Sequence, residues 1–263
     1  MISKQKTKTI HSLAHKKFRD QTSLFIGEGP KVVEELLHTF QCTYIAATAE
    51  WLTSNRVLLS PDVETEVVTP DELTKASLQQ TPQQVIAIFR KKIFQLHEPI
   101  IDNPQCSIVL ALDTIQDPGN LGTILRIASW FGILAIVCSP DTADIYSPKV
   151  VQATMGAIGK TPVIYTPLPQ FLDSVPEGVT VYGTLLDSNS ENIYEAPLTT
   201  GGIIVMGNEG NGISPEVRAH LHRSLYIPHF PTNTTPAIES LNVGIATAIT
   251  CAEFRRRSNK PNK

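Results

Sequence analysis

The segment most suggestive of chemistry is a glycine-rich stretch that follows a run of apolar residues. It has the sequence Gly-Asn-Glu-Gly-Asn-Gly-Ile-Ser at residues 207–214, directly after the apolar residues 203–206. Glycine allows tight turns and lets a ligand approach the peptide groups closely, and Glu209 adds a carboxylate. The stretch is neither a Walker loop nor the Gly-x-Gly-x-x-Gly dinucleotide fingerprint. We therefore predict a backbone-exposing loop beside a carboxylate at the end of a buried strand.

A second polar segment joins an apolar strand, predicted at 108–112, to a helix. Residues 117–126 are Asp-Pro-Gly-Asn-Leu-Gly-Thr-Ile-Leu-Arg, and strand ends of this kind carry the ligand sites of open α/β sheets. Because each helical residue turns by about 100°, Asn120 and Arg126 would point in different directions, so we expect Asn120 in the loop and Arg126 inside the helix. Arg126 has apolar helix neighbours, which favours an anionic partner for it; a structural salt bridge is the alternative.

A third segment combines Ile-Pro at 227–228 with Glu-Ser-Leu-Asn-Val at 239–243. Ser240 and Asn242 offer short polar groups at the start of a helix predicted over 240–257. The unpaired amides of a helix N-terminus favour anions and carboxylates. Taken alone, Ser240 is most simply an N-cap.

Strand and helix patterns alternate regularly after residue 106. Apolar runs predict buried strands at residues 108–112, 133–137, 179–182, 203–206 and 225–227. Ser-Pro pairs at 147–148 and 214–215 are helix-start signals. Strands that are apolar throughout, in alternation with helices, predict an α/β domain with a parallel sheet.

The chain divides into two predicted domains. Residues 1–95 mix helical and strand patterns, with a helix expected at 31–37 and short strands at 44–47 and 85–89. Two prolines in residues 96–105 favour a linker. Residues 106–258 form the second domain, and 259–263 a basic tail.

Composition excludes several classes of protein. The chain has 263 residues, 41% hydrophobic and 18% charged, which is typical of a soluble globular protein. No apolar run approaches the roughly 18 residues of a membrane span, and the N-terminus does not resemble a signal peptide. The cysteines lie far apart, so we expect free thiols in a reducing cytoplasm and no metal site. They are Cys42, Cys106, Cys138 and Cys251.

The formal net charge of −3 hides an uneven distribution. Residues 1–19 and 255–263 hold 11 of the 22 Lys and Arg and no Asp or Glu. Such ends attract phosphates, although solvated basic termini are also common in cytosolic proteins.

Taken together, the three segments resemble the three motifs of the SpoU/TrmH branch of the SPOUT RNA methyltransferases, and the resemblance covers residues 106–257. Residues 17–20, 25–31 and 81–85 are similar to the opening and close of the small substrate-binding domain found in that family, which resembles a ribosomal protein.

The resemblance implies a C-terminal parallel-sheet SPOUT domain with a deep trefoil knot and a small N-terminal α/β substrate-binding domain. It implies a homodimer that transfers a methyl group from S-adenosylmethionine to a ribose 2′-hydroxyl in RNA, with rRNA favoured over tRNA. A tRNA 2′-O-methyltransferase and a non-catalytic RNA-binding or ribosome-assembly protein remain as alternatives. A small-molecule transferase of Rossmann type is disfavoured by the missing dinucleotide fingerprint.

Residue roles follow from the same resemblance. The implied active-site residues are Arg126, Asn120, Glu209, Ser240 and Asn242. The implied cofactor contacts are Thr184, Gly207, Ile227 and Leu241. The expected RNA contacts are Lys16, Lys17, Arg19 and Arg126. The chain departs from the family pattern at His229, at Gly244 and in a longer segment at 229–238.

Overall fold

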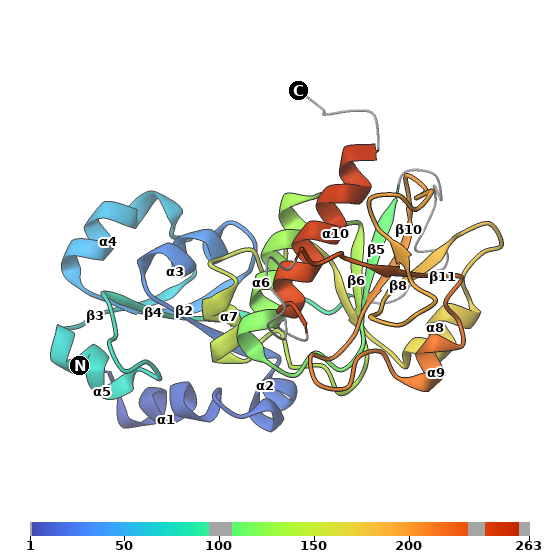
Figure 1. Cartoon of the computed structure of the whole chain (residues 1–263). Coiled ribbons are helices and arrows are strands. Elements are labelled where there is room, and N and C mark those ends of the chain that lie inside the picture. Colours follow the sequence, from blue (N-terminus) through green and yellow to red (C-terminus); the bar gives the residue numbers. More distant parts are fainter. Residues whose placement is uncertain (1, 95–106, 231–239, 258–263) are drawn as a thin grey trace. The chain divides into compact units, whose positions relative to one another are not determined.

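The computed structural model describes residues 2–94, 107–230 and 240–257, and its contacts divide the chain into two compact units (Figure 1). The first unit comprises Met1–Ile93 and Asp144–Lys160, and the second comprises Phe94–Ala143 and Thr161–Lys263. The predicted linker, the basic tail and most of the 229–238 segment lie outside the described residues.

The first unit contains a four-stranded mixed sheet. In sheet order its strands are β1 (Leu24–Glu28), β4 (Val85–Arg90), β2 (Cys42–Ala47) and β3 (Glu64–Val67). β4 is antiparallel to both neighbours, and β3 is parallel to β2. The helices are α1 (Lys4–Ser12), α2 (Lys16–Thr22), α3 (Pro30–Leu37), α4 (Ala49–Asn55), α5 (Pro70–Ala76) and α7 (Pro148–Ala153), with the 3-10 turn η1 (Arg56–Leu58). The predicted helix and both predicted strands of this region are confirmed.

An internal segment of the chain, Asp144–Lys160, packs within the first unit rather than with the residues around it in sequence. Tyr146 contributes its ring to the core, with its centroid 4.8 Å from that of Phe25, and its hydroxyl donates to the Lys92 carbonyl at 2.6 Å. Gly156 has φ +88°, and a Cβ there would lie 2.2 Å from Glu35 Cβ. The compact units therefore differ from the predicted domain boundaries at this segment.

The second unit contains a seven-stranded sheet in which every described pairing is parallel. In sheet order the strands are β7 (Val163–Tyr165), β6 (Ala135–Cys138), β5 (Ile108–Leu112), β10 (Gly202–Met206), β8 (Val181–Thr184), β11 (Arg223–Tyr226) and β9 (Glu191–Asn192). The central strands β5 and β10 are buried at every residue. Burial on both faces requires the continuous apolar runs seen in the sequence. The predicted parallel α/β domain is confirmed.

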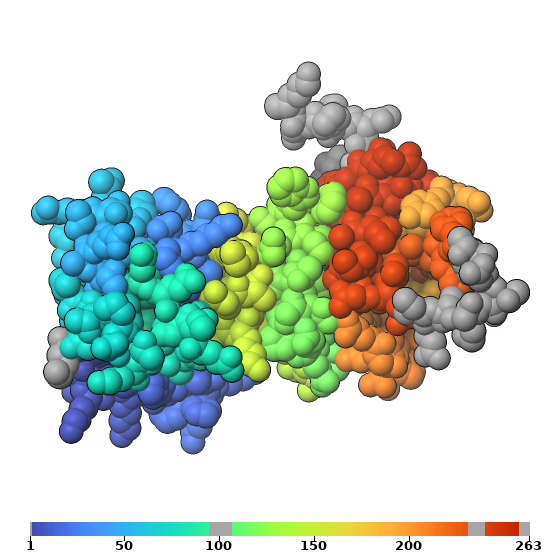
Figure 2. Space-filling model, turned by 60° about the vertical axis from the view of Figure 1, so that its left-hand side comes forward, coloured from blue at the N-terminus to red at the C-terminus, as the bar shows by residue number. Residues whose placement is uncertain are grey.

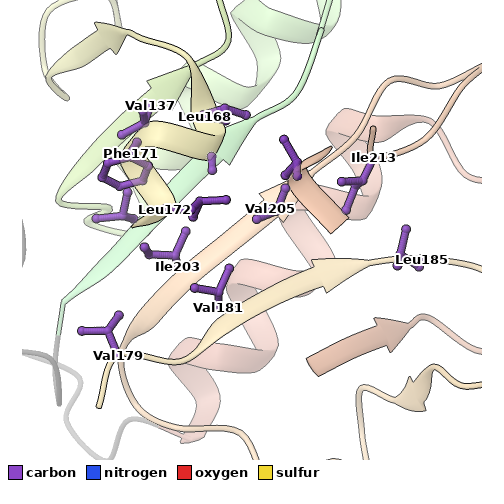
Figure 3. Close-up of a cluster of buried hydrophobic side chains, with 13 residues drawn as sticks. Val137, Leu168, Phe171, Leu172, Val179, Val181, Leu185, Ile203, Val205 and Ile213 are labelled. Atoms are coloured by element: carbon purple, nitrogen blue, oxygen red, sulfur yellow. The ribbon is translucent and has the colours of Figure 1, made fainter. Parts of the chain in front are cut away.

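Helices cover both faces of this sheet. They are α6 (Pro118–Trp130), α8 (Leu168–Asp173), α9 (Pro215–Arg218) and α10 (Val243–Arg257). Alternate residues of β5 and β10, together with Val181 of β8, pack under α8 in one apolar cluster (Figure 3). On the other face, the Tyr182 ring of β8 meets Phe254 of α10 edge-on at 5.0 Å, and α10 lies along α6 (Figure 1). No helix in the described ranges is long and apolar enough to cross a membrane.

Candidate active site

The candidate site lies where β5 and β10 end. These strands pair in parallel, with Leu112 opposite Met206, so their carboxyl ends meet at one edge of the sheet. β5 continues into α6 with Asn120, and β10 continues into the glycine-rich loop with Glu209. The adjacency of the two strands brings together segments that are 89 residues apart in sequence.

The glycine-rich loop is a very tight turn. Asn208 and Gly212 exchange two backbone hydrogen bonds of 2.9 and 2.8 Å, which leaves only residues 209–211 at the tip. Gly212 has φ +68°, a conformation that glycine adopts without strain, and a Cβ on Gly207 would lie 2.4 Å from the Gly212 carbonyl carbon. The glycines are therefore required by the close return of the backbone, and Glu209 is exposed at the tip.

One oxygen of Glu209 collects three hydrogen bonds. Its Oε1 accepts from Asn120 Nδ2 at 2.7 Å, from Asn242 Nδ2 at 2.9 Å and from the Val243 N–H at 3.3 Å. The three donors hold this oxygen in one position. The predicted residues Asn120, Glu209 and Asn242 thus form one hydrogen-bonded cluster.

The start of α10 orients this cluster. Asn242 Oδ1 accepts from the N–H groups of Gly244 and Ile245 at 3.0 and 3.3 Å, so Asn242 caps the helix. With its oxygen used in this way, its Nδ2 turns to Glu209 and to Asn120 Oδ1, the latter at 2.8 Å. The predicted helix start at residue 240 is wrong, because α10 begins at Val243. Ser240 lies outside the helix and is exposed.

Asn120 lies in the first turn of α6, so its predicted place in the loop is wrong. Asp117 caps the helix by accepting from the Asn120 N–H at 2.7 Å, and Pro118 occupies the first turn. Both features favour an earlier helix start than the apolar spacing suggested. Arg126 lies inside α6 as predicted; it is exposed, and no described residue forms an ion pair or hydrogen bond with it.

The residues expected to hold the cofactor lie near the same edge of the sheet. Thr184 ends β8, Gly207 follows β10 and Ile227 follows β11, and these three strands are neighbours. All three residues are half-buried, while Leu241, just before α10, is 50% exposed. Strand ends offer main-chain donors and acceptors, and Ile227 and Leu241 offer apolar surface. This donor set fits a ligand with a flat ring and polar edges.

The residues expected to contact RNA separate into two groups. Lys16 and Lys17 are exposed at the start of α2. Arg19 is only 2% exposed: its Nε and Nη2 donate to Asp144 Oδ2 at 3.0 and 2.7 Å, and its Nη1 donates to two main-chain carbonyls. Arg19 therefore holds the first unit together, and we no longer assign it to RNA.

The arginines at the end of α10 are also engaged within the protein. Arg255 donates to the carbonyls of Phe131 and Gly132 at 2.7 and 2.6 Å, at the C-terminus of α6. Arg256 and Arg257 both pair with Glu253, at 2.8 Å, and Arg257 also donates to the Ala196 carbonyl. The charge pattern had indicated a phosphate-attracting patch here, but these contacts give the side chains structural roles.

The described thiols are protonated at neutral pH. Burial raises the pKa of Cys42 to about 11 and that of Cys251 to about 12, and it also raises the pKa of Cys138. Within residues 2–94, 107–230 and 240–257, no three His, Cys, Asp or Glu side chains are grouped to hold a metal ion.

Two further polar residues at this edge were not among the predicted site residues. Asn208 lies inside the glycine-rich segment, and Asp113 follows the apolar run of β5. Their positions at strand ends were the available signal. Their hydrogen-bond partners lie in distant segments and could not be inferred from sequence spacing.

Two regions of the chain match known protein families. Residues 107–252 match the model of the SpoU rRNA Methylase family, and residues 4–87 match that of the MRM3-like substrate-binding domain. The chain belongs to the SpoU rRNA Methylase family, so the predicted family is confirmed.

Relatives extend over nearly the whole chain. The chain is 32% identical over 256 residues to the 23S rRNA (guanosine(2553)-2′-O)-methyltransferase RlmP of Bacillus subtilis, covering 95% of this chain and 96% of that protein. A solved structure of a putative TrmH-family RNA methyltransferase from Porphyromonas gingivalis shares 40% identity with a TM-score of 0.82, covering 98% of this chain and 99% of that one. An AdoMet-bound rRNA methyltransferase from Sinorhizobium meliloti shares 28% identity with a TM-score of 0.80, covering 99% and 97%.

Proposed function

We propose that this protein transfers the methyl group of S-adenosylmethionine to the 2′-hydroxyl of a ribose in 23S rRNA. The observation that carries the proposal is the Asn120, Glu209 and Asn242 cluster, with Arg126 exposed on the same helix as Asn120. Family membership and the similarity to RlmP along almost the full length of both chains support the reaction and the substrate class.

S-adenosylmethionine supplies an electrophilic methyl group on a sulfonium. We assign its binding to Thr184, Gly207, Ile227 and Leu241, which offer main-chain groups at neighbouring strand ends and apolar surface. An AdoMet-bound relative of similar fold supports this cofactor. The protein's own task is then to hold the ribose hydroxyl in line with the methyl group, and such orientation can lower the barrier by several kcal/mol.

Arg126 serves as an anchor for the RNA phosphate and polarises the hydroxyl. A guanidinium loses its proton only above a pH of about 12, so it is a poor general base. Glu209 is the better proton acceptor: its Oε1 is held by three donors, and its Oε2 has no partner among the described residues. A well-placed base contributes about 10²–10⁴-fold to the rate.

The RNA is held in part by the first unit. Lys16 and Lys17 present exposed positive charge there, and residues 4–87 match a substrate-binding domain. Phosphate contacts of this kind position a nucleic acid without reading its sequence. Ser240, exposed just before the α10 cap, remains a candidate active-site contact with the substrate.

We further assign a homodimer, a C-terminal trefoil knot and a cytoplasmic location. Trp130 on α6 is 85% exposed and Ile245 on α10 is 52% exposed, and the surfaces of the two helices lie side by side in Figure 2. A second copy packed on this helix pair would cover both side chains. The family resemblance favours the knot. Unpaired thiols suit a reducing compartment.

The test uses rRNA and tRNA from cells that lack the gene. Each pool is incubated with purified protein and methyl-labelled S-adenosylmethionine, digested to nucleosides and analysed for label. Label in a 2′-O-methylnucleoside from 23S rRNA supports the proposal. Label only from tRNA would replace the substrate, label in a base would replace the reaction, and cofactor binding without transfer to RNA or to ribosomal particles would favour a non-catalytic RNA-binding protein.

A further inference from the structure

We infer that Asn208 is a positioning residue that fixes the catalytic carboxylate of Glu209 relative to Asn120. Its side chain joins the loop that carries Glu209 to the end of the strand that leads to Asn120. The inference deepens the proposed function and rests on it.

Asn208 first shapes its own loop. Its Oδ1 accepts from the N–H groups of Gly210 and Asn211 at 2.9 and 3.1 Å. Asparagine favours turns because its side chain can bond the backbone two residues on. Together with the backbone bonds to Gly212, these contacts hold the three residues at the loop tip in one conformation.

The same side chain reaches the neighbouring loop. Asn208 Nδ2 donates to the Thr114 carbonyl at 2.8 Å, two residues after the end of β5. The orientation of the amide is unambiguous, because its oxygen faces two N–H donors and its nitrogen faces a carbonyl. Asp113 adds a second link, since its Oδ2 accepts from the Ser214 N–H at 2.7 Å.

Thr114 is held in a conformation that its side chain disfavours. Its φ is +59°, and the left-handed region costs a non-glycine residue about 1–2 kcal/mol. Its N–H donates to Ser139 Oγ at 2.8 Å, while its carbonyl accepts from Asn208. Strained backbone persists where its surroundings enforce it, commonly beside functional sites. The strain at Thr114 therefore indicates that surrounding contacts enforce the backbone conformation between β5 and α6.

The contacts close into a ring. From Thr114 the chain runs to Asp117, which caps α6 at Asn120; Asn120 bonds Glu209; and Glu209 adjoins Asn208, which returns to Thr114. Removal of the Asn208 to Thr114 bond opens this ring, so the Asn208 side chain no longer ties the loop of Glu209 to the segment that leads to Asn120. A displacement of about 1 Å can cost about 10²-fold in rate.

Two matched substitutions test the inference. Asn208→Asp keeps an oxygen for Gly210 and Asn211 but places a second oxygen against the Thr114 carbonyl. Asn211→Asp makes the same chemical change on an exposed neighbour whose side chain has no partner among the described residues. We expect N208D to lower kcat by about 10- to 100-fold and N211D to change it by less than about twofold.

The dissociation constant of S-adenosylmethionine, its binding stoichiometry and the Tm are measured in parallel. In N208D we expect the dissociation constant of S-adenosylmethionine to change by less than about threefold. The binding stoichiometry should be unchanged. A loss of activity that matches the loss of binding-competent protein would overturn the inference, because Asn208 would then serve only folding. If N208D does not fold, Asn208→Ser takes its place: it keeps an acceptor for Gly210 but is too short to reach Thr114.

A double-mutant cycle supplies the decisive readout. If Asn208 acts through Glu209, N208D combined with Glu209→Gln is no slower than E209Q alone, since residues that act as a unit are not additive. Additive losses would overturn the inference, as would equal rates for N208D and N211D. An inactive wild-type protein would instead reject the proposed function, so the two failures are distinguishable.

Discussion

The side chain of Asn242 caps α10 through its Oδ1 and donates through its Nδ2 to Glu209 Oε1 at 2.9 Å. One residue therefore starts a helix and orients the candidate catalytic carboxylate. Because the two roles use different atoms of the amide, substitutions can separate them.

Asn242→Asp should keep the helix cap and lose the donor to Glu209. A carboxylate at a helix N-terminus is a good cap, but it would repel Glu209 across a hydrogen-bond distance. Asn242→Ala loses both roles and about 0.5–2 kcal/mol of stability. We expect thermal unfolding to show N242D close to wild type and N242A less stable, with methyl transfer strongly reduced in both. An active N242D would show that this donor is dispensable.

Arg126→Ala should abolish methyl transfer while leaving cofactor affinity nearly unchanged. Arg126 is exposed and has no described partner, so its removal disturbs no packing. Transfer assays and calorimetric titration with S-adenosylmethionine check the two halves of this expectation. Loss of cofactor binding in R126A would contradict the assignment of Arg126 to the RNA.

Replacing both Lys16 and Lys17 by Gln should weaken RNA binding without affecting stability. Both side chains are exposed on α2, and each phosphate contact contributes about 0.7–0.9 to the slope of log K against log salt. We expect the slope to fall by about 1–2, measured by RNA titration at several salt concentrations. An unchanged slope would remove these lysines from the RNA interface.

Arg255→Gln should lower the stability of the protein and leave RNA binding unchanged, which is the opposite of the result expected for the two lysines. Arg255 bonds the carbonyls of Phe131 and Gly132 at the end of α6, so its loss should cost about 1–2 kcal/mol of stability. RNA affinity at fixed salt should be unchanged, apart from a weak long-range charge effect. Reduced RNA affinity with an unchanged Tm would return Arg255 to the RNA-binding surface.

Glu28→Gln should change how stability depends on pH. Burial raises the pKa of Glu28 above its ordinary 4.5, against hydrogen bonds from Ser77 and Leu78 that lower it. The folded protein thus holds this proton more tightly than the unfolded chain, and the associated stability is present below pH 4.5 and is lost as pH rises through the folded pKa. E28Q lacks this titrating group. As the pH rises through the folded-state pKa of Glu28, we therefore expect the stability of E28Q to increase relative to that of wild type. Parallel Tm curves for the two proteins would contradict the raised pKa.

Local patterns in the sequence determined much of the architecture. The continuous apolar runs predicted the buried parallel strands, because a strand covered on both faces needs apolar residues at every position. Ser147-Pro148 predicted α7, and the structure shows Ser147 capping it. The three polar segments also contain Asn120, Glu209 and Asn242, and the family resemblance implied their place in the active site.

Tertiary structure decided which polar side chains are engaged within the protein and which can contact a substrate. Arg19 looked like an RNA contact by charge, but its partner Asp144 lies 125 residues away in sequence; Arg255 is engaged with the end of α6 in the same way. Hydrogen bonds between distant segments depend on which strands become neighbours in the sheet. Local sequence propensity does not determine this strand order. The link from Asn208 to Thr114 exists for the same reason: β5 and β10 lie side by side in the sheet, and only the fold brings their ends together.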